Sequence, residues 1–128
     1  MSRLPSSGEK ELVLRLVGSH FSEVDVIEGQ LESSRVRELS DGNVLEFEPL
    51  ASRKLTTTKT VLGEGSVRDL DGVPVIISLL QRDGYLWRLD ISRADGQRIR
   101  GPLNYQAVVA LGFGQGVSLE DGARAQKE

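Results

Sequence analysis

Three Asp-Gly pairs follow one another at intervals of twelve residues, beginning at Asp71, Asp83 and Asp95. Carboxylates at regular spacing can bind calcium, and an EF-hand loop needs oxygen ligands at its positions 1, 3 and 5, Gly at 6 and Glu at 12. Counted from Asp69, Gly falls at position 4 and Leu80 at position 12, so the pattern does not match. Asp accepts local backbone hydrogen bonds and Gly adopts positive φ, so we interpret the three pairs as turns and expect no metal site.

Paired carboxylates could also perform acid–base chemistry, because Asp69 and Asp71 are two residues apart and could share one side of an extended segment. Glu46 and Glu48 have the same spacing, which any solvated strand face produces. We therefore assign no catalytic residue, and a small carboxylate-dependent hydrolase or isomerase with an Arg as anion clamp stays an alternative. The candidate polar surface site comprises Asp69, Asp71, Arg88, Asp90 and Arg100.

The side chains needed for other chemistries are sparse. His20 is the only His and the chain has no Cys, so one His cannot build a zinc site and disulfides are excluded. No nucleophile-elbow pattern is present. The Gly-rich stretches at 63–65 and 112–116 lack the Lys and the strand–loop–helix context of phosphate-binding loops. We expect no cofactor.

The charge balance gives no general attraction to nucleic acid or to an anionic membrane, because 16 basic residues face 19 acidic ones and the net charge is −3. Arg88, Arg98 and Arg100 are predicted on adjacent strands, so RNA binding stays a weaker alternative, although Asp90 lies between them. No apolar run is long enough for a signal peptide or a membrane helix. We expect a cytoplasmic protein.

The elements that would position these residues indicate one α+β domain over 1–116, with a flexible tail over 117–128. The Ser6–Glu9 spacing is a capping box, which predicts a helix from there to Gly18. A second cap at Ser22 predicts a helix over residues 23–32. An antiparallel β-meander follows these N-terminal helices. After Pro102 the chain has helical character as far as Leu111, which predicts a short C-terminal helix or irregular tail.

The predicted sheet begins with a hairpin around the Asp-Gly at 41–42 and continues with strands at 60–68, 73–81, 85–93 and 97–101. Apolar side chains at odd positions predict one buried face, provided that each loop has an odd number of residues. We therefore expect three-residue loops at 82–84 and 94–96. The expected register pairs Leu79 with Trp87, Ile77 with Leu89, Ile91 with Ile99 and Asp90 with Arg100.

This register leaves Ile76, Leu80 and Leu86 on the face opposite the core, where large apolar residues need cover. A homodimer or an unidentified protein partner would provide it. With no coherent catalytic set in the sequence, the leading hypothesis is a non-enzymatic binding or interaction module, immunity-like or accessory. That hypothesis rests on analogy of fold.

The chain resembles a family of small bacterial proteins described only as a domain of unknown function. The matching residues are Arg3-Leu4, the "E..LV.RLV" pattern of the first helix, Phe21, Gln30-Leu31 and Val36, followed by "DLDGVPVIISLLQRDGYLWRLDISRADGQRI". The resemblance covers residues 3–100 and departs from the family pattern at Arg88, where an acidic residue is expected. It implies a helical N-terminus followed by an antiparallel sheet and a bacterial origin, and it supplies no activity.

Overall fold

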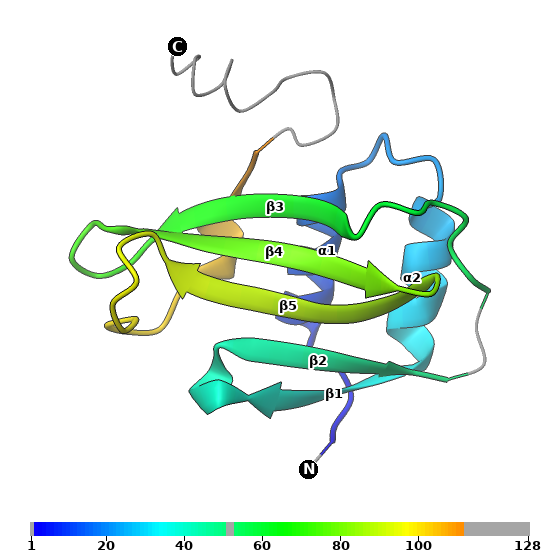
Figure 1. The fold of residues 1–128 in the computed structure, drawn as a ribbon, viewed down its shortest axis with the longest axis horizontal. Coiled ribbons are helices and arrows are strands. Elements are labelled where there is room, and N and C mark those ends of the chain that lie inside the picture. Colours follow the sequence, from blue (N-terminus) through cyan, green and yellow to red (C-terminus); the bar gives the residue numbers. More distant parts are fainter. Residues whose placement is uncertain (1, 51–52, 112–128) are drawn as a thin grey trace.

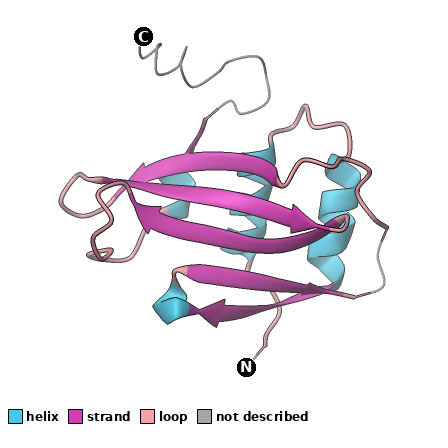
Figure 2. Ribbon diagram, viewed as in Figure 1, coloured by secondary structure: helices cyan, strands magenta, loops and turns pink. Residues whose placement is uncertain are grey.

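The computed structural model describes residues 2–50 and 53–111, which form two helices followed by a six-stranded antiparallel sheet (Figures 1 and 2). The predicted α+β class is confirmed. The predicted tail at 117–128 lies outside the described residues. The elements are α1 (Ser7–Val17), α2 (Val24–Ser33), β1 (Ser34–Leu39), β2 (Val44–Pro49), β3 (Val61–Arg68), β4 (Pro74–Arg82), β5 (Tyr85–Arg93) and β6 (Val109–Ala110), with short 3-10 turns η1 (Ser40–Gly42) and η2 (Tyr105–Ala107).

The strands follow the order β1-β2-β5-β4-β3-β6, and both helices lie against one face of the sheet (Figure 1). The core lies between the helices and this inner face. Its buried residues include Leu12, Leu16, Ile27 and Leu31 from the helices, and Val36, Phe47, Ile77, Leu79, Leu86 and Leu89 from the strands. The opposite face, here called the outer face, is not covered by either helix (Figure 2).

The start of α1 follows the predicted capping box. The Ser6 hydroxyl accepts a hydrogen bond from the Glu9 N–H at 3.1 Å, and a Glu9 carboxylate oxygen accepts one from the Ser6 N–H at 2.9 Å. The helix ends where predicted, at Gly18 with φ of 87°. The start of α2 differs, because Glu23 occupies the cap position without a side-chain hydrogen bond and Ser22 is not used.

Gly63 lets α1 approach β3 more closely than any other residue would. A Cβ built on Gly63 would lie 2.2 Å from the carbonyl oxygen of Leu16. A bulge is present at the same place, since the β3–β4 register shifts between Val61 and Gly63. The last turn of α1 therefore rests directly on the strand backbone.

The β4–β5 hairpin has a shorter loop than predicted. Arg82 pairs with Tyr85, leaving a two-residue turn in which Asp83 and Gly84 have φ of 57° and 88°. Gln81 then pairs with Leu86, and a bulge on β5 places Leu80 opposite Arg88. The two turn residues and the one extra residue of the bulge together give the odd number that was expected from the loop alone.

This register corrects two side-chain placements. Leu86 is 1% exposed in the core, so it is not available to the predicted interface. Trp87 takes the extra position of the bulge, half-buried and outside the core cluster. Beyond the bulge, Leu79 pairs with Leu89 and Ile77 with Ile91, so the expected Leu79–Trp87 and Ile77–Leu89 pairs do not form, although odd positions again share the buried layer.

The predicted strand at 97–101 is absent. The neighbour of β5 on that side is β2, with Leu45 opposite Leu89 and Val44 opposite Asp90, so the expected Ile91–Ile99 and Asp90–Arg100 pairs do not form. The N–H groups of Arg100 and Gly101 instead donate to the carboxylate of Asp69. Farther along the chain, between Pro102 and Leu111, the last residue that the structure describes, the helical part is limited to η2, and β6 then pairs with β3.

Candidate functional site

One end of the sheet holds a buried arginine, Arg93, whose side chain is 2% exposed and is surrounded by three carboxylates. Its Nη1 lies 2.9 Å from Oδ2 of Asp69 and 2.9 Å from Oδ1 of Asp71, and its Nη2 lies 2.7 Å from Oδ2 of Asp95. Two of the three Asp-Gly pairs therefore bind the same guanidinium. We call these four residues the Arg93 clamp.

Asp69 is the most enclosed member of the clamp, with a side chain that is 0% exposed. Its two oxygens accept hydrogen bonds from the backbone N–H groups of Leu70, Arg100 and Gly101 and from Arg93. Burial alone would raise the pKa of Asp69, but these N–H donors outweigh it and hold the pKa below its ordinary value. A carboxylate in this state has no free oxygen for a substrate.

Asp71 and Asp95 lie at the rim of the clamp, with side chains 39% and 40% exposed. Hydrogen bonds from Arg93 lower the pKa of both carboxyls, and the carboxylates in turn raise the pKa of Arg93. The clamp thus ties the β3–β4 connection to the end of β5 and the following loop.

The turn interpretation of these Asp-Gly pairs is confirmed, since Gly72 and Gly96 have φ of 88° and 76°. The sequence reasoning missed the shared arginine. A signal was present, because Arg93 continues the odd, core-facing positions of β5, and an arginine that is buried needs carboxylate partners.

Arg88 and Asp90 lie on the outer face of β5, away from the clamp. The Arg88 Nε lies 2.9 Å from Oδ1 of Asp90, and the two side chains are 36% and 37% exposed. Arg100 reaches Asp69 through its backbone N–H. The five residues of the candidate polar site therefore fall into two groups, with Asp69, Asp71 and the Arg100 backbone at the clamp, and Arg88 with Asp90 on the outer face.

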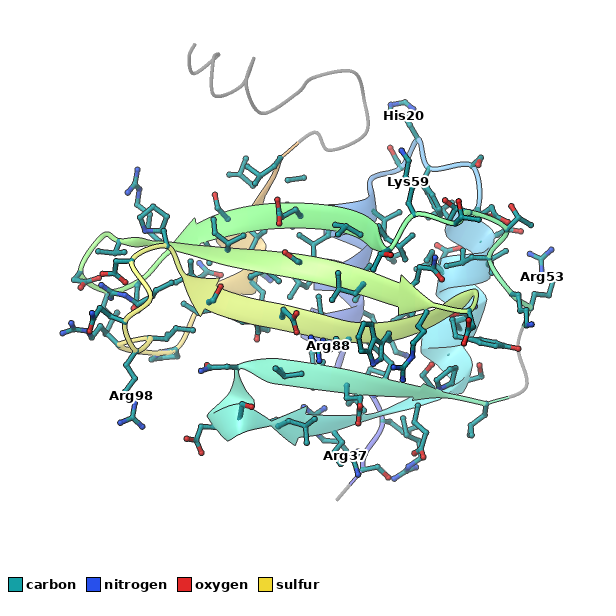
Figure 3. The ribbon with its side chains drawn as sticks, in the orientation of Figure 1. His20, Arg37, Arg53, Lys59, Arg88 and Arg98 are labelled. Carbon is teal, nitrogen blue, oxygen red and sulfur yellow. The ribbon has the colours of Figure 1, made fainter. Side chains whose placement is uncertain are left out.

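The end of the β4–β5 hairpin carries a cluster of aromatic and cationic side chains. The guanidinium carbons of Arg82 and Arg88 lie 4.3 and 4.4 Å from the centroid of the Trp87 ring, and Nζ of Lys54 lies 5.9 Å from that of Tyr85. Trp87 is the only Trp of the chain. We call these five residues the hairpin-tip cluster; Figure 3 shows Arg88 lying along the outer face between β5 and β2.

A fully buried glutamine, Gln30 of α2, fixes the hairpin to the helix layer. Its Nε2 donates to the carbonyl oxygens of Arg53 at 2.7 Å and Gly84 at 2.8 Å, and its Oε1 accepts from the Leu86 N–H at 2.8 Å. All three partners are backbone groups, and the Gly84 carbonyl oxygen also accepts from the Leu55 N–H at 2.8 Å. Gln30 therefore sets the position of the turn.

A second glutamine, Gln81 of β4, attaches the preceding loop to the same turn. Its Nε2 donates to the carbonyl oxygens of Lys59 at 2.7 Å and Thr57 at 3.3 Å, and its Oε1 accepts from the Gly84 N–H at 2.8 Å. The loop over residues 53–60 thus lies along the hairpin tip. Sequence reasoning assigned no role to either glutamine.

Between this loop and the hairpin lies a pocket of about 570 Å³. Leu55, four threonines of the loop, Arg82 and Trp87 are among its lining residues. Arg82 is exposed and forms no ion pair within the part of the chain that the structure describes. The hairpin tip thus combines an open pocket, an indole and an uncompensated cation.

The remaining candidates lie elsewhere. His20 is exposed between the helices, and in Figure 3 it and Arg98 extend away from the sheet on opposite sides of the molecule. Over residues 2–50 and 53–111, no three His, Asp or Glu side chains are arranged to hold a metal ion. Neither described helix has the length and apolar character needed to cross a bilayer.

Comparison with known proteins places the chain in a family. No curated protein and no solved structure matches it. The family model for a domain of unknown function, DUF6984, matches residues 2–103. That span covers both helices, strands β1 to β5, the Arg93 clamp and the hairpin-tip cluster. The chain therefore belongs to the DUF6984 family.

Proposed function

We propose that the protein is a non-enzymatic binding module and that its hairpin-tip cluster contacts a protein partner. The observation that carries this proposal is the β5 bulge, which turns the only Trp of the chain away from the core and places it against Arg82 and Arg88. Bulges are over-represented at sheet edges and next to active sites, where they re-aim a side chain or end strand pairing. Trp, Tyr and Arg are the residues that contribute most to binding energy at protein interfaces.

The core does not need Trp87, because Leu86 occupies the buried position beside it. Two guanidinium groups near one ring also place like charges close together, and only Arg88 has a carboxylate partner, Asp90, in the described residues. An arrangement that adds little to the core and concentrates cations at an aromatic surface is typical of an interface in its unbound state.

The proposed contact surface continues onto β4. Leu80 lies opposite Arg88 on the outer face, and Ile76 lies on the same face, both half-buried. A second copy of the chain is one partner that this surface would accept, as the sequence suggested. We also propose that the protein is bacterial and cytoplasmic, as expected from the sequence.

The geometry does not favour the alternative of a carboxylate-dependent enzyme. Both carboxylates of the pair Asp69 and Asp71 would have to be accessible to a substrate, whereas Asp69 is fully enclosed and hydrogen-bonded. The RNA-binding alternative is also weakened, because Arg98 and Arg100 are in a loop and not on a strand next to Arg88.

The test compares partner capture by four immobilised full-length proteins: the wild type, Trp87→Ser, Arg82→Gln and, as a matched control, Arg98→Gln. Extract proteins retained by the wild type and by Arg98→Gln, but lost from both hairpin variants, would support the proposal. Equal retention by all four would contradict it, provided that circular dichroism shows all four folded. Light scattering of the same proteins decides whether the partner is a second copy.

A further inference from the structure

The pocket beside the hairpin tip is rich in hydrogen-bond donors. Within the loop over residues 53–60, the carbonyl oxygens of Thr57 and Lys59 accept from the side chain of Gln81, and that of Thr60 accepts from its N–H. The backbone N–H groups of Thr57, Thr58 and Thr60 have no partner in the described part of the chain. The loop therefore leaves these three N–H groups available to a ligand, together with the carbonyl oxygens of Leu55, Thr56 and Thr58, which also have no partner among the described residues.

The threonine side chains add further hydrogen-bond donors. Four of them line the pocket, and the hydroxyl of Thr57 accepts from the Lys59 N–H, which leaves its own hydrogen free to donate. In the addition of a strand to a sheet edge, alternate backbone N–H groups bind the carbonyl oxygens of an extended peptide. Thr58 and Thr60 are two residues apart, which is the spacing that this mode of binding uses.

The charges around the pocket favour an anionic ligand. Arg82 lines the pocket and has no carboxylate partner among the described residues. Lys54 and Arg88 stack on the neighbouring rings, so three cations gather at the hairpin tip. Asp83 is the only carboxylate among the lining residues and is exposed at the turn, and the Glu23 carboxylate lies next to the pocket, bound to the N–H of Thr56.

We propose that this pocket binds an acidic, extended peptide segment of the partner. A Glu or Asp carboxylate of the segment pairs with the guanidinium of Arg82, and its backbone carbonyl oxygens accept from Thr58 and its neighbours. A planar guanidinium accepts a carboxylate in a two-point hydrogen bond, which gives orientation as well as attraction. The inference rests on the proposed function and names the chemistry of the partner.

Trp87 provides the readout, because it is the only Trp and lines the pocket. Its fluorescence in the full chain is followed during titration with a hexaglutamate peptide, with a hexaglutamine peptide of the same length, and with inorganic phosphate. We expect saturable binding of hexaglutamate only. Equal binding of hexaglutamine, no response to hexaglutamate, or equally tight binding of phosphate would each overturn the inference.

Two substitutions at the turn move the affinity in opposite directions. Arg82→Gln should weaken hexaglutamate binding about tenfold. Asp83→Asn should strengthen it about two- to fivefold, because it removes a repelling charge while Asn suits the positive φ of 57° at this position. Arg98→Gln should leave it unchanged, and an Arg98→Gln loss as large as that of Arg82→Gln would overturn the inference.

The inference and the proposed function fail separately. If partner capture depends on Trp87 and Arg82 while hexaglutamate does not bind, the binding module stands and the acidic peptide is excluded. If hexaglutamate binds with the expected dependence on Arg82 while partner capture is equal for all variants, the pocket is a site for acidic peptides. The partner contact at the hairpin-tip cluster is then excluded.

Discussion

Asp69 and Arg93 form a buried ion pair across 24 residues of sequence, with Oδ2 of the aspartate 2.9 Å from Nη1 of the arginine. Replacement of Arg93 by Met would leave Asp69 enclosed without its guanidinium, and the loop over 94–101 would lose its attachment to Asp71. We expect Arg93→Met to lower the melting temperature clearly, as breaking one side of a buried pair does. Calorimetry would show this, and Arg98→Met is the control. A melting temperature equal to that of the control would show that the clamp is not structural.

The clamp also predicts the acid limit of stability. The folded state holds the pKa of Asp69, Asp71 and Asp95 below the ordinary carboxyl value of 3.8. As the pH falls through that value, the unfolded chain takes up protons before the folded one. The contribution of these carboxylates to the free energy of unfolding is therefore fully present above about pH 5 and declines below about pH 4. Urea unfolding at a series of pH values measures the decline. A flat profile down to pH 3 would contradict it, and Arg93→Met should show a shallower one.

Gln30→Leu tests the buried amide that fixes the hairpin turn. Leucine has a similar volume but cannot hydrogen-bond to the carbonyl oxygen of Arg53 or to the N–H of Leu86, whereas the Gly84 carbonyl oxygen keeps its bond from the Leu55 N–H. We expect a loss of about 3 kcal/mol in the free energy of unfolding, measured by urea denaturation. Glu28→Leu, at an exposed position of the same helix, is the matched control and should change it little. A loss below about 0.5 kcal/mol for Gln30→Leu would show that water replaces the amide.

Gly63→Ala tests the close contact between α1 and β3. The added Cβ would meet the Leu16 carbonyl group, and backbone cannot move aside as a flexible side chain can. We expect a loss of about 2 kcal/mol or more in the free energy of unfolding. Gly29→Ala is the control, because no atom lies within 4 Å of a Cβ there, and it should be neutral or stabilising. Equal effects of the two substitutions would mean that the helix is packed more loosely than described.

Leu86→Ala and Trp87→Ala together test the register of the hairpin. Leu86 is 1% exposed in the core, so its truncation should cost about 3 kcal/mol of unfolding free energy. Trp87, although larger, packs outside the core against Arg82 and Arg88, so its loss should cost about 1 kcal/mol. The reverse order would restore the register that the sequence alone predicted.

Much of the fold follows from local signals in the sequence. The capping box at Ser6 and Glu9, the apolar period of α1 and the Asp-Gly turns each have one dominant local cause, and the elements they predict are present. The alternation at Ile77, Leu79, Leu89 and Ile91 predicts the buried layer for the same reason, because period two depends on neighbouring residues alone.

The features that the sequence did not predict depend on distant partners. A two-residue turn with a bulge and a three-residue turn give the same parity farther along the hairpin, so the pattern at Leu79 and Leu89 could not distinguish them. The segment 97–101 has strand-like residues, but the carboxylate of Asp69 takes its N–H groups. The hairpin-tip cluster was missed because Trp87 was assigned to the core, where large aromatic residues are commonest.

The bulge in β5 makes the pairing of β4 with β5 independent of Trp87, the side chain that the bulge turns away from the core. With Trp87 deleted, Leu80 and Arg88 would be ordinary cross-strand neighbours, and every other pair of the hairpin would keep its present partner. Trp87 is thus a one-residue insertion in β5 that does not change which side chains form the buried layer. The recognition that we propose at this tip could therefore change through a single codon without a change in the other residue pairs of the hairpin.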